Sequence, residues 1–380
     1  MNTLWNKFLN LSPWVRMLLA VALVLLLSMS IAGVGLYNFV QALKIENEPV
    51  RNPPTDVMTS AGQLKPSSTI LRFVSAAQTI NTLGDRTSIG KTQAQPASLT
   101  PELISAFQNA IATMAATNLA DILEQGYRST GQQDAYNLLL LRERVRCLAS
   151  FSIMLKREAP TTDVSPILKA MVHDTLLMER VSPLLISKMV SVACGGIVSN
   201  MIHQLVATGS LLPSEAGSLR QLIGTFKQYR LSLAEAMIFE ARFVETLVLK
   251  LYRRAPLGSW LLHTIFGDPM IDYRKVVAEC ETMDRIAFHA ALEKISNPLT
   301  KIMIPNLTKA REVFIQKAAW ESIVIQELQD LEGATADKAI DPYTSQALLM
   351  KQIDGKNRYY AAGPNARDDG MTDDDVFFAP

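Results

Sequence analysis

The chain has 380 residues, of which 48% are hydrophobic and only 7% aromatic, and its 37 basic and 36 acidic residues leave a formal net charge of +1. This balance argues against a dedicated nucleic-acid surface, which needs an excess or a stripe of basic residues, so we expect no nucleic-acid partner. The abundance of Leu, Ala, Met and Ile favours helices over strands and predicts a mainly α-helical fold.

The first predicted element is an apolar segment at residues 17–40, which follows a short tail at residues 1–16. No residue between Arg16 and Lys44 is charged. About 20 helical residues cross a hydrocarbon core about 30 Å thick, so the segment predicts a transmembrane signal-anchor. A cleaved signal peptide is the alternative, but the apolar run exceeds the usual signal core of about 7–15 residues.

The orientation of this span follows from the long segment after it. Basic residues flank both ends of the span, and long C-terminal domains are translocated largely regardless of their charge. We therefore expect a single-pass protein of the bacterial inner membrane, with a cytoplasmic N-terminus and a periplasmic body.

Residues 41–98 are predicted to form a linker, because prolines and polar residues dominate it. A short apolar segment, Ile70–Leu83, predicts one short helix within the linker. Residues 99–335 predict an all-α domain, an antiparallel helical array or bundle with Pro and Gly at most joints. The expected helices span residues 100–125, 132–156, 164–179, 183–208, 213–228, 231–254, 271–295 and 299–331.

The helix expected at residues 183–208 is apolar enough to suggest a second membrane span. Lys188 lies within it, however, and its apolar run is shorter than the run at residues 17–40. We therefore expect a buried core helix at this position.

The three cysteines, Cys147, Cys194 and Cys280, are far apart and odd in number. They do not form a disulfide framework, and we expect buried small hydrophobic residues. A single bridge in an oxidising compartment is the alternative.

Residues of catalytic type are few, and each has a structural interpretation. His173, Asp174 and Glu179 do not share one helix face, so they predict a polar surface helix. His203 predicts a histidine satisfied within the core. Glu240 lies on an apolar stripe, where a carboxylate is costly unless it is paired, so we expect an internal salt bridge to another element. No catalytic or cofactor-binding residue is assigned.

Residues 336–380 predict a small β-hairpin followed by an acidic tail. Ala347–Lys351 and Arg358–Ala361 are the expected strands, joined through the strong turn signal Asp354-Gly355. Calcium takes six to eight oxygen ligands, which clustered carboxylates can supply. The alternative is a solvated acidic terminus. The candidate calcium ligands are Asp368, Asp369, Asp373, Asp374 and Asp375.

The same segment carries Asp341-Pro342-Tyr343-Thr344, Gly363-Pro364-Asn365 and Asp368-Asp369-Gly370. This pattern resembles a C-terminal module of uncharacterised, membrane-anchored helical proteins of planctomycete-type bacteria. It is also similar to the calcium loop at the end of type II secretion major pseudopilins, although the N-terminus lacks the leader of a true pilin. The resemblance implies a cell-envelope protein with a calcium-binding tail.

These features together predict a non-catalytic scaffold or interaction protein of the cell envelope. Its expected partners are the lipid bilayer and other envelope proteins. One alternative is a component of a secretion or envelope assembly system with a pseudopilin-like tail. Another is an enzyme whose site the sequence does not reveal.

Overall fold

A computed structural model describes ten stretches of the protein. The predicted anchor at residues 17–40, the tail before it and most of the linker lie outside them, so these expectations stay predictions. The described residues are 67–87, 89, 99–123, 138–181, 185–240, 285–295, 307–334, 338–353, 355–372 and 374–378.

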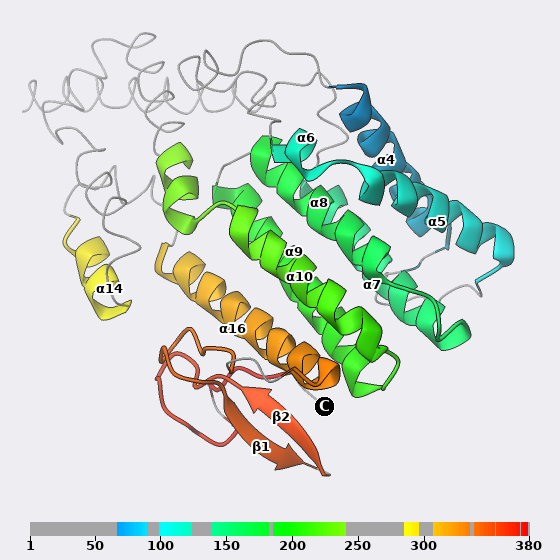
Figure 1. The fold of residues 1–380 in the computed structure, drawn as a ribbon. Coiled ribbons are helices and arrows are strands. Elements are labelled where there is room, and N and C mark those ends of the chain that lie inside the picture. The colour runs from blue at the N-terminus through cyan, green and yellow to red at the C-terminus, as the bar shows by residue number, and fades with distance from the viewer. Residues whose placement is uncertain are drawn as a thin grey trace, which may run out of the picture.

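In this part of the chain the fold is mainly helical and ends in a two-stranded antiparallel sheet, as predicted (Figure 1). Residues 233–240 are also helical. The named helices are α4 (Ser68–Thr87), α5 (Pro101–Ala116), α6 (Leu119–Leu123), α7 (Leu138–Glu158), α8 (Ser165–Val181), α9 (Leu185–Ala207), α10 (Pro213–Tyr229), α14 (Arg285–Glu293) and α16 (Leu307–Glu332).

The centre of the helical body is built from α7, α8, α9 and α10. Helix α9 packs against α7, α8 and α16, and α10 packs against α8 and α16. Helices α4 and α5 pack on one side of this centre, while α16 lies on the side that carries the hairpin (Figure 1). Helix α16 therefore packs against the helical body on one side and against the C-terminal residues on the other.

Helix α9 is the only helix in the described stretches that is long and apolar enough to cross a membrane. Its position is inside the body, and the polar side chains of Lys188 and His203 are buried there. Each of them meets a carboxylate of a neighbouring helix, Glu179 or Glu327. These contacts agree with the prediction of a core helix at this position.

The prediction of a polar surface helix at α8 is wrong. His173, Asp174 and Glu179 were expected on a polar surface helix, but each is no more than 2% exposed. The two carboxylates can be buried because they have basic partners on other helices. Arg144 of α7 pairs with Asp174, and Lys188 of α9 pairs with Glu179. Spacing along one helix does not reveal such partners.

Helix α4 is longer and more deeply packed than the short linker helix predicted there. It spans 20 residues and buries Phe73 and Ile80 in the same apolar cluster as Phe107 of α5. The segment predicted as part of the linker therefore contributes an apolar face to the core of the helical body.

The helix predicted over residues 100–125 is broken in two. It begins as predicted, with the Thr100 side chain accepting a hydrogen bond from the Leu103 amide. Thr117 then adopts extended backbone angles and ends α5. The Asn118 side chain accepts from the Ala120 amide and starts α6, as expected of a residue that competes with helix hydrogen bonds.

The predicted β-hairpin is confirmed, with strands β1 (Leu349–Ile353) and β2 (Lys356–Tyr360) in antiparallel register. Ile353 pairs with Lys356, which leaves two residues in the turn. Gly355 has φ +74°, a conformation that favours glycine over other residues.

The C-terminal residues form a small module docked on α16. The side chains of Ala319 and Ile323 from α16 are buried against Leu348, Ala361 and Val376. Hydrogen bonds fix the contact further. The bonds are donated by Tyr359 to Asp330 of α16, by Tyr343 to Glu312 of α16, and by the Ala339 amide to Gln326 of α16.

Candidate functional site

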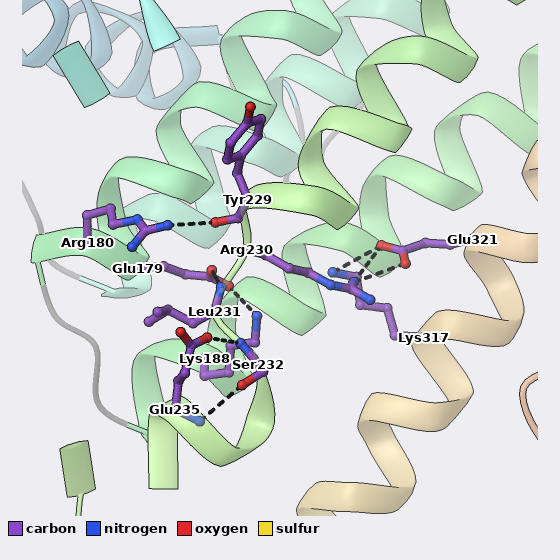
Figure 2. A network of polar contacts seen from close by, with 10 residues as sticks. All are labelled: Glu179, Arg180, Lys188, Tyr229, Arg230, Leu231, Ser232, Glu235, Lys317 and Glu321. Atoms are coloured by element: carbon purple, nitrogen blue, oxygen red, sulfur yellow. Dashed lines mark hydrogen bonds and ion pairs between the residues drawn. The ribbon is translucent and has the colours of Figure 1, made fainter. Parts of the chain in front are cut away.

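A cluster of buried charged residues lies where α8, α9 and α16 meet the segment that follows α10 (Figure 2). Glu179 comes from α8, Lys188 from α9, and Lys317 and Glu321 from α16, while Arg230 follows the last residue of α10. Four of them are no more than 4% exposed, and Arg230 is partly buried. We take this cluster as the candidate site, because buried ionised groups are costly and are retained only with specific partners.

The first pair of the cluster joins α8 to α9. Lys188 Nζ donates a 2.8 Å hydrogen bond to Glu179 Oε1. The second oxygen, Oε2, accepts a 2.8 Å bond from the backbone amide of Leu231. Glu179 therefore holds two elements at once, the N-terminal part of α9 and the chain that leaves α10.

The second group joins that chain to α16. Arg230 donates from one nitrogen to both oxygens of Glu321, at 2.9 and 3.0 Å. Lys317 Nζ lies 3.2 Å from Glu321 Oε1, in a geometry that makes no well-directed hydrogen bond. Its ammonium also lies 4.3 Å from the ring centre of Phe226, a cation–π contact.

Two glycines let α16 come close enough for these contacts. A Cβ atom at Gly195 would lie 2.1 Å from Lys317 Cε, and one at Gly196 would lie 3.0 Å from the Trp320 ring. The pair Gly195-Gly196 is therefore the place where the Lys317 and Trp320 side chains cross α9.

The segment after α10 is fixed on its other side as well. Arg180 donates a 3.0 Å hydrogen bond to the Tyr229 carbonyl. Ser232 and Glu235 bond each other's backbone amides and form a capping box at the start of the helical stretch 233–240. The cluster thus sets the direction in which the chain leaves α10 (Figure 2).

The cluster holds three cationic residues and two carboxylates, and burial changes their proton affinities. Burial lowers the pKa of Lys188 to about 8, although Glu179 acts in the opposite direction. Burial also lowers the pKa of Lys317. For Glu321, burial raises the pKa, but Lys317 and Arg230 together outweigh it and leave a net lowering. For both lysines burial is the largest cause of the lowered pKa, and the neighbouring cations of the cluster act in the same direction.

Other buried pairs outside the cluster also connect different helices. Arg144 donates hydrogen bonds from Nε and Nη2 to the two oxygens of Asp174, at 2.7 and 3.0 Å. Lys156 Nζ lies 2.7 Å from Glu215 Oε2. Each of these contacts joins α7 to another central helix.

The prediction for His203 is confirmed. His203 is buried, and its Nδ1 lies 2.8 Å from Glu327 Oε1 on α16. Its ring stacks on Phe378 of the C-terminal segment, with ring centres 4.4 Å apart. The histidine therefore takes part in docking the C-terminal module.

Glu240 has a partner on another element, as predicted. Within the residues that the structure describes, this partner is the Leu185 amide, which donates a 3.3 Å hydrogen bond to the carboxylate, and the predicted salt bridge stays a prediction. Burial raises the pKa of this half-buried carboxyl group. The hydrogen bond from the Leu185 amide acts in the opposite direction and lowers the pKa.

Two cysteines behave as predicted. Cys147 and Cys194 are buried and free, and burial raises the pKa of each thiol to about 12. Cys280 lies outside the described residues.

The aspartates proposed as calcium ligands mostly bond to their own loop. Asp368 Oδ1 accepts from the Tyr360 hydroxyl at 2.8 Å and from the Gly370 amide at 3.0 Å. Asn365 Nδ2 donates to both Asp369 and Asp374, each at 2.6 Å. These bonds give the carboxylates a structural role in closing the loop.

The remaining aspartates are Asp375 and Asp373. Asp375 accepts from the Met371 amide at 2.8 Å, and its other oxygen is buried without a partner. No group of three His, Cys, Asp or Glu side chains suited to a metal occurs within the stretches that the structure describes. Asp373 lies outside them, so the calcium site stays a prediction.

The sequence contained one signal for the cluster that the predictions did not use. On α16, the helical spacing that places Ala310, Val324 and Leu328 in the core also places Lys317 and Glu321 there. Two opposite charges four residues apart within an apolar stripe mark a buried pair.

Comparisons with known proteins found no relative of the chain. No protein-family model, no curated protein and no solved structure matches the chain. The resemblance of the C-terminal segment therefore stays an expectation from the sequence.

Proposed function

We propose that the chain is a non-catalytic scaffold of the cell envelope, tethered to the membrane through residues 17–40, whose helical body holds partner proteins near the bilayer. The apolar segment near the N-terminus supports the tether. The arrangement of buried ion pairs in the body supports the scaffold.

The observation that carries the proposal is that buried ion pairs brace the body from helix to helix. Breaking one such pair strands a buried charge and costs about 3–5 kcal/mol, so the pairs strongly favour one relative placement of the helices. A scaffold needs such fixed geometry to present partners in one orientation. The pairs are Arg144–Asp174, Lys156–Glu215, Glu179–Lys188 and Arg230–Glu321. The contact between His203 and Glu327 adds a further link between α9 and α16.

The docked C-terminal module extends this rigid body. Phe378 stacks on His203 of α9, and the Trp320 ring of α16 lies 6.1 Å from Phe378 between ring centres. The module also carries exposed apolar side chains, Ile340 at 54% and Met350 at 53% exposure. We propose that partner proteins contact the module at these two side chains.

The tether is tested by fractionation of the full chain. We expect the protein to stay in the membrane pellet after osmotic shock and alkaline carbonate washing. Deletion of residues 17–40 should release it, while an equal deletion within the predicted linker, at residues 41–64, should not. A mature protein recovered in the soluble fraction without its first forty residues would refute the tether.

The scaffold is tested by photo-crosslinking in native membranes. A photoreactive residue replaces Met350 or Ile340, and the same residue at exposed Gln228 of α10 serves as the control. We expect the two module positions to crosslink a defined set of envelope proteins that Gln228 does not. Identical sets from all three positions would contradict a specific partner surface.

A second candidate, a secretion component with a calcium-binding tail, is favoured by one observation. Asp375 carries a buried oxygen without a partner, close to the other aspartates of the loop. If calcium orders this tail, millimolar calcium should raise the Tm and a chelator should lower it. An unchanged Tm would remove this candidate.

A further inference from the structure

Strand β1 has one free edge. Helix α16 packs against β2, and β1 is the other strand of the small sheet (Figure 1). The two-residue turn makes Ile353 and Lys356, which flank it, a hydrogen-bonded pair. Because such pairs alternate along an antiparallel ladder, the backbone groups of Met350 and Gln352 point away from β2. No described residue forms a hydrogen bond with either of these two backbones at that edge.

The side chains along β1 are also accessible. Met350 is 53% exposed and Ile353 is 38% exposed, and Lys351 and Gln352 are exposed as well. An open edge strand presents unpaired amide and carbonyl groups, on which an extended peptide can add a further strand. The free edge therefore has the backbone groups and the access that strand addition requires.

The hairpin carries three basic side chains on one face. Lys351 lies directly opposite Arg358, and Lys356 lies two residues from Arg358 along β2, so all three share that face. Lys351 Nζ donates to the Gly370 carbonyl at 2.9 Å, and none of the three is paired with a carboxylate of the described residues. Like charges directly opposite each other destabilise a strand pair, so acidic side chains added beside them would compensate their charge.

Given the proposed scaffold function, on which this step rests, we infer that β1 binds an extended segment of a partner protein in which acidic and apolar residues alternate. The backbone of the segment pairs with Met350 and Gln352 and adds a third strand to the sheet. Side chains alternate between the two faces of a sheet, so the residue opposite Lys351 is acidic and the residue opposite Met350 is apolar.

A second copy of this chain is the rival occupant. If two β1 strands paired in antiparallel through the free backbone groups of both Met350 and Gln352, each Lys351 would lie directly opposite its copy. Like charges in that position are destabilising, and a lysine on an edge strand opposes pairing between copies. An acidic segment meets no such repulsion, which favours a different protein as the partner.

Strand addition is tested in native membranes with a photoreactive residue at Met350 of the full chain. Gln352→Pro removes an amide that points away from β2, so it blocks the added strand while the hairpin keeps its own hydrogen bonds. Gln352→Ala keeps that amide and is the matched control. We expect the envelope proteins crosslinked from Met350 to be lost in Gln352→Pro and kept in Gln352→Ala.

The outcomes separate strand addition from the scaffold function. Equal crosslinking in Gln352→Pro and Gln352→Ala would leave the scaffold standing and overturn strand addition. If Met350 crosslinks no specific protein when Gln352 is unchanged, both fail. A product that joins two copies of this chain through β1 would overturn the acidic partner and identify a second copy as the occupant.

A defined peptide tests the charge preference without a proline in the hairpin. The probe is a short fluorescent peptide of alternating valine and glutamate, compared with a valine–lysine peptide by fluorescence anisotropy on the full chain in mild detergent. We expect the glutamate peptide to bind more tightly, and Lys351→Glu to weaken its binding by roughly threefold to tenfold. Arg157→Glu makes the same charge change at an exposed site on α7 and should leave binding unchanged. Equal binding of the two peptides, or equal losses in the two variants, would overturn the acidic preference.

Discussion

The crossing of α9 and α16 at Gly195 permits a sharp test of the packing around the charge cluster. In Gly195→Ala the new methyl group would lie 2.1 Å from Lys317 Cε and 2.5 Å from its Nζ. A lysine end is normally flexible, but this one is 1% exposed and sits against Phe226 and Glu321. Contacts with both neighbours would have to change before the side chain could move away from the new methyl group.

The expected magnitude follows from two opposing effects. Overpacking of a filled core costs about 1–3 kcal/mol. Alanine in place of glycine within a helix gains about 0.5–1 kcal/mol. Gly224→Ala on α10 isolates the second effect, because nothing lies within 4 Å of its added methyl group. The difference between the two variants therefore measures the clash alone, at about 1–3 kcal/mol.

The assay is thermal unfolding of the full chain in a mild detergent, followed by far-UV circular dichroism. Each kcal/mol corresponds to a Tm shift of roughly 2–4 °C for a domain of this size class. We expect Gly224→Ala to raise the Tm and Gly195→Ala to lower it, and expect Lys317→Ala to remove much of the Gly195→Ala effect in the double variant. Equal shifts for the two glycine variants would refute the packing argument.

Three further predictions concern buried charges. Glu215 accepts from Lys156, the Val164 amide and the Leu212 amide, so Glu215→Ala should cost about 3–5 kcal/mol in thermal unfolding, and a wild-type Tm would contradict its burial. Burial lowers the pKa of His173 to about 4, so the unfolded chain binds its proton more tightly and stability should fall as the pH drops from about 6.5 toward 4. His173→Gln should flatten that fall in a pH series of melting curves, and an unchanged slope would count against it. With Lys188 near pKa 8, the unfolded chain holds the extra proton up to its ordinary pKa, so Lys188 should contribute a rise in stability between about pH 8 and 10.5. The slope of stability against pH in this window should therefore be lower for Lys188→Met than for the wild type, and equal slopes would count against the lowered pKa.

The helices could be predicted because their signals are local. Thr100 caps α5, Pro213 begins α10, and the turn at Gly355 closes the hairpin, and each of these features needs only its sequence neighbours. The break at Thr117 was missed because the helical pattern continues across it. A polar residue that competes for backbone hydrogen bonds decides the local structure there.

The candidate site could not be predicted in the same way, because its partners are distant in sequence. Glu179 and the Leu231 amide that it binds are 52 residues apart, and Arg230 and Glu321 are 91 apart. A charged residue on a helix has the same local pattern whether it faces water or a partner in the core. The identity of the partner depends on how the helices pack, which periodicity alone does not determine.

Helix α16 also has a consequence for how the protein is made. One of its faces contributes to the core of the helical body, and the other is covered by residues that the ribosome adds later, among them Leu348, Val376 and Phe378. During synthesis, Trp320 and Ile323 therefore remain uncovered after the helical body has emerged. A nascent chain that stalls in this interval exposes this apolar face of α16 to chaperones and proteases. Only the finished chain covers it.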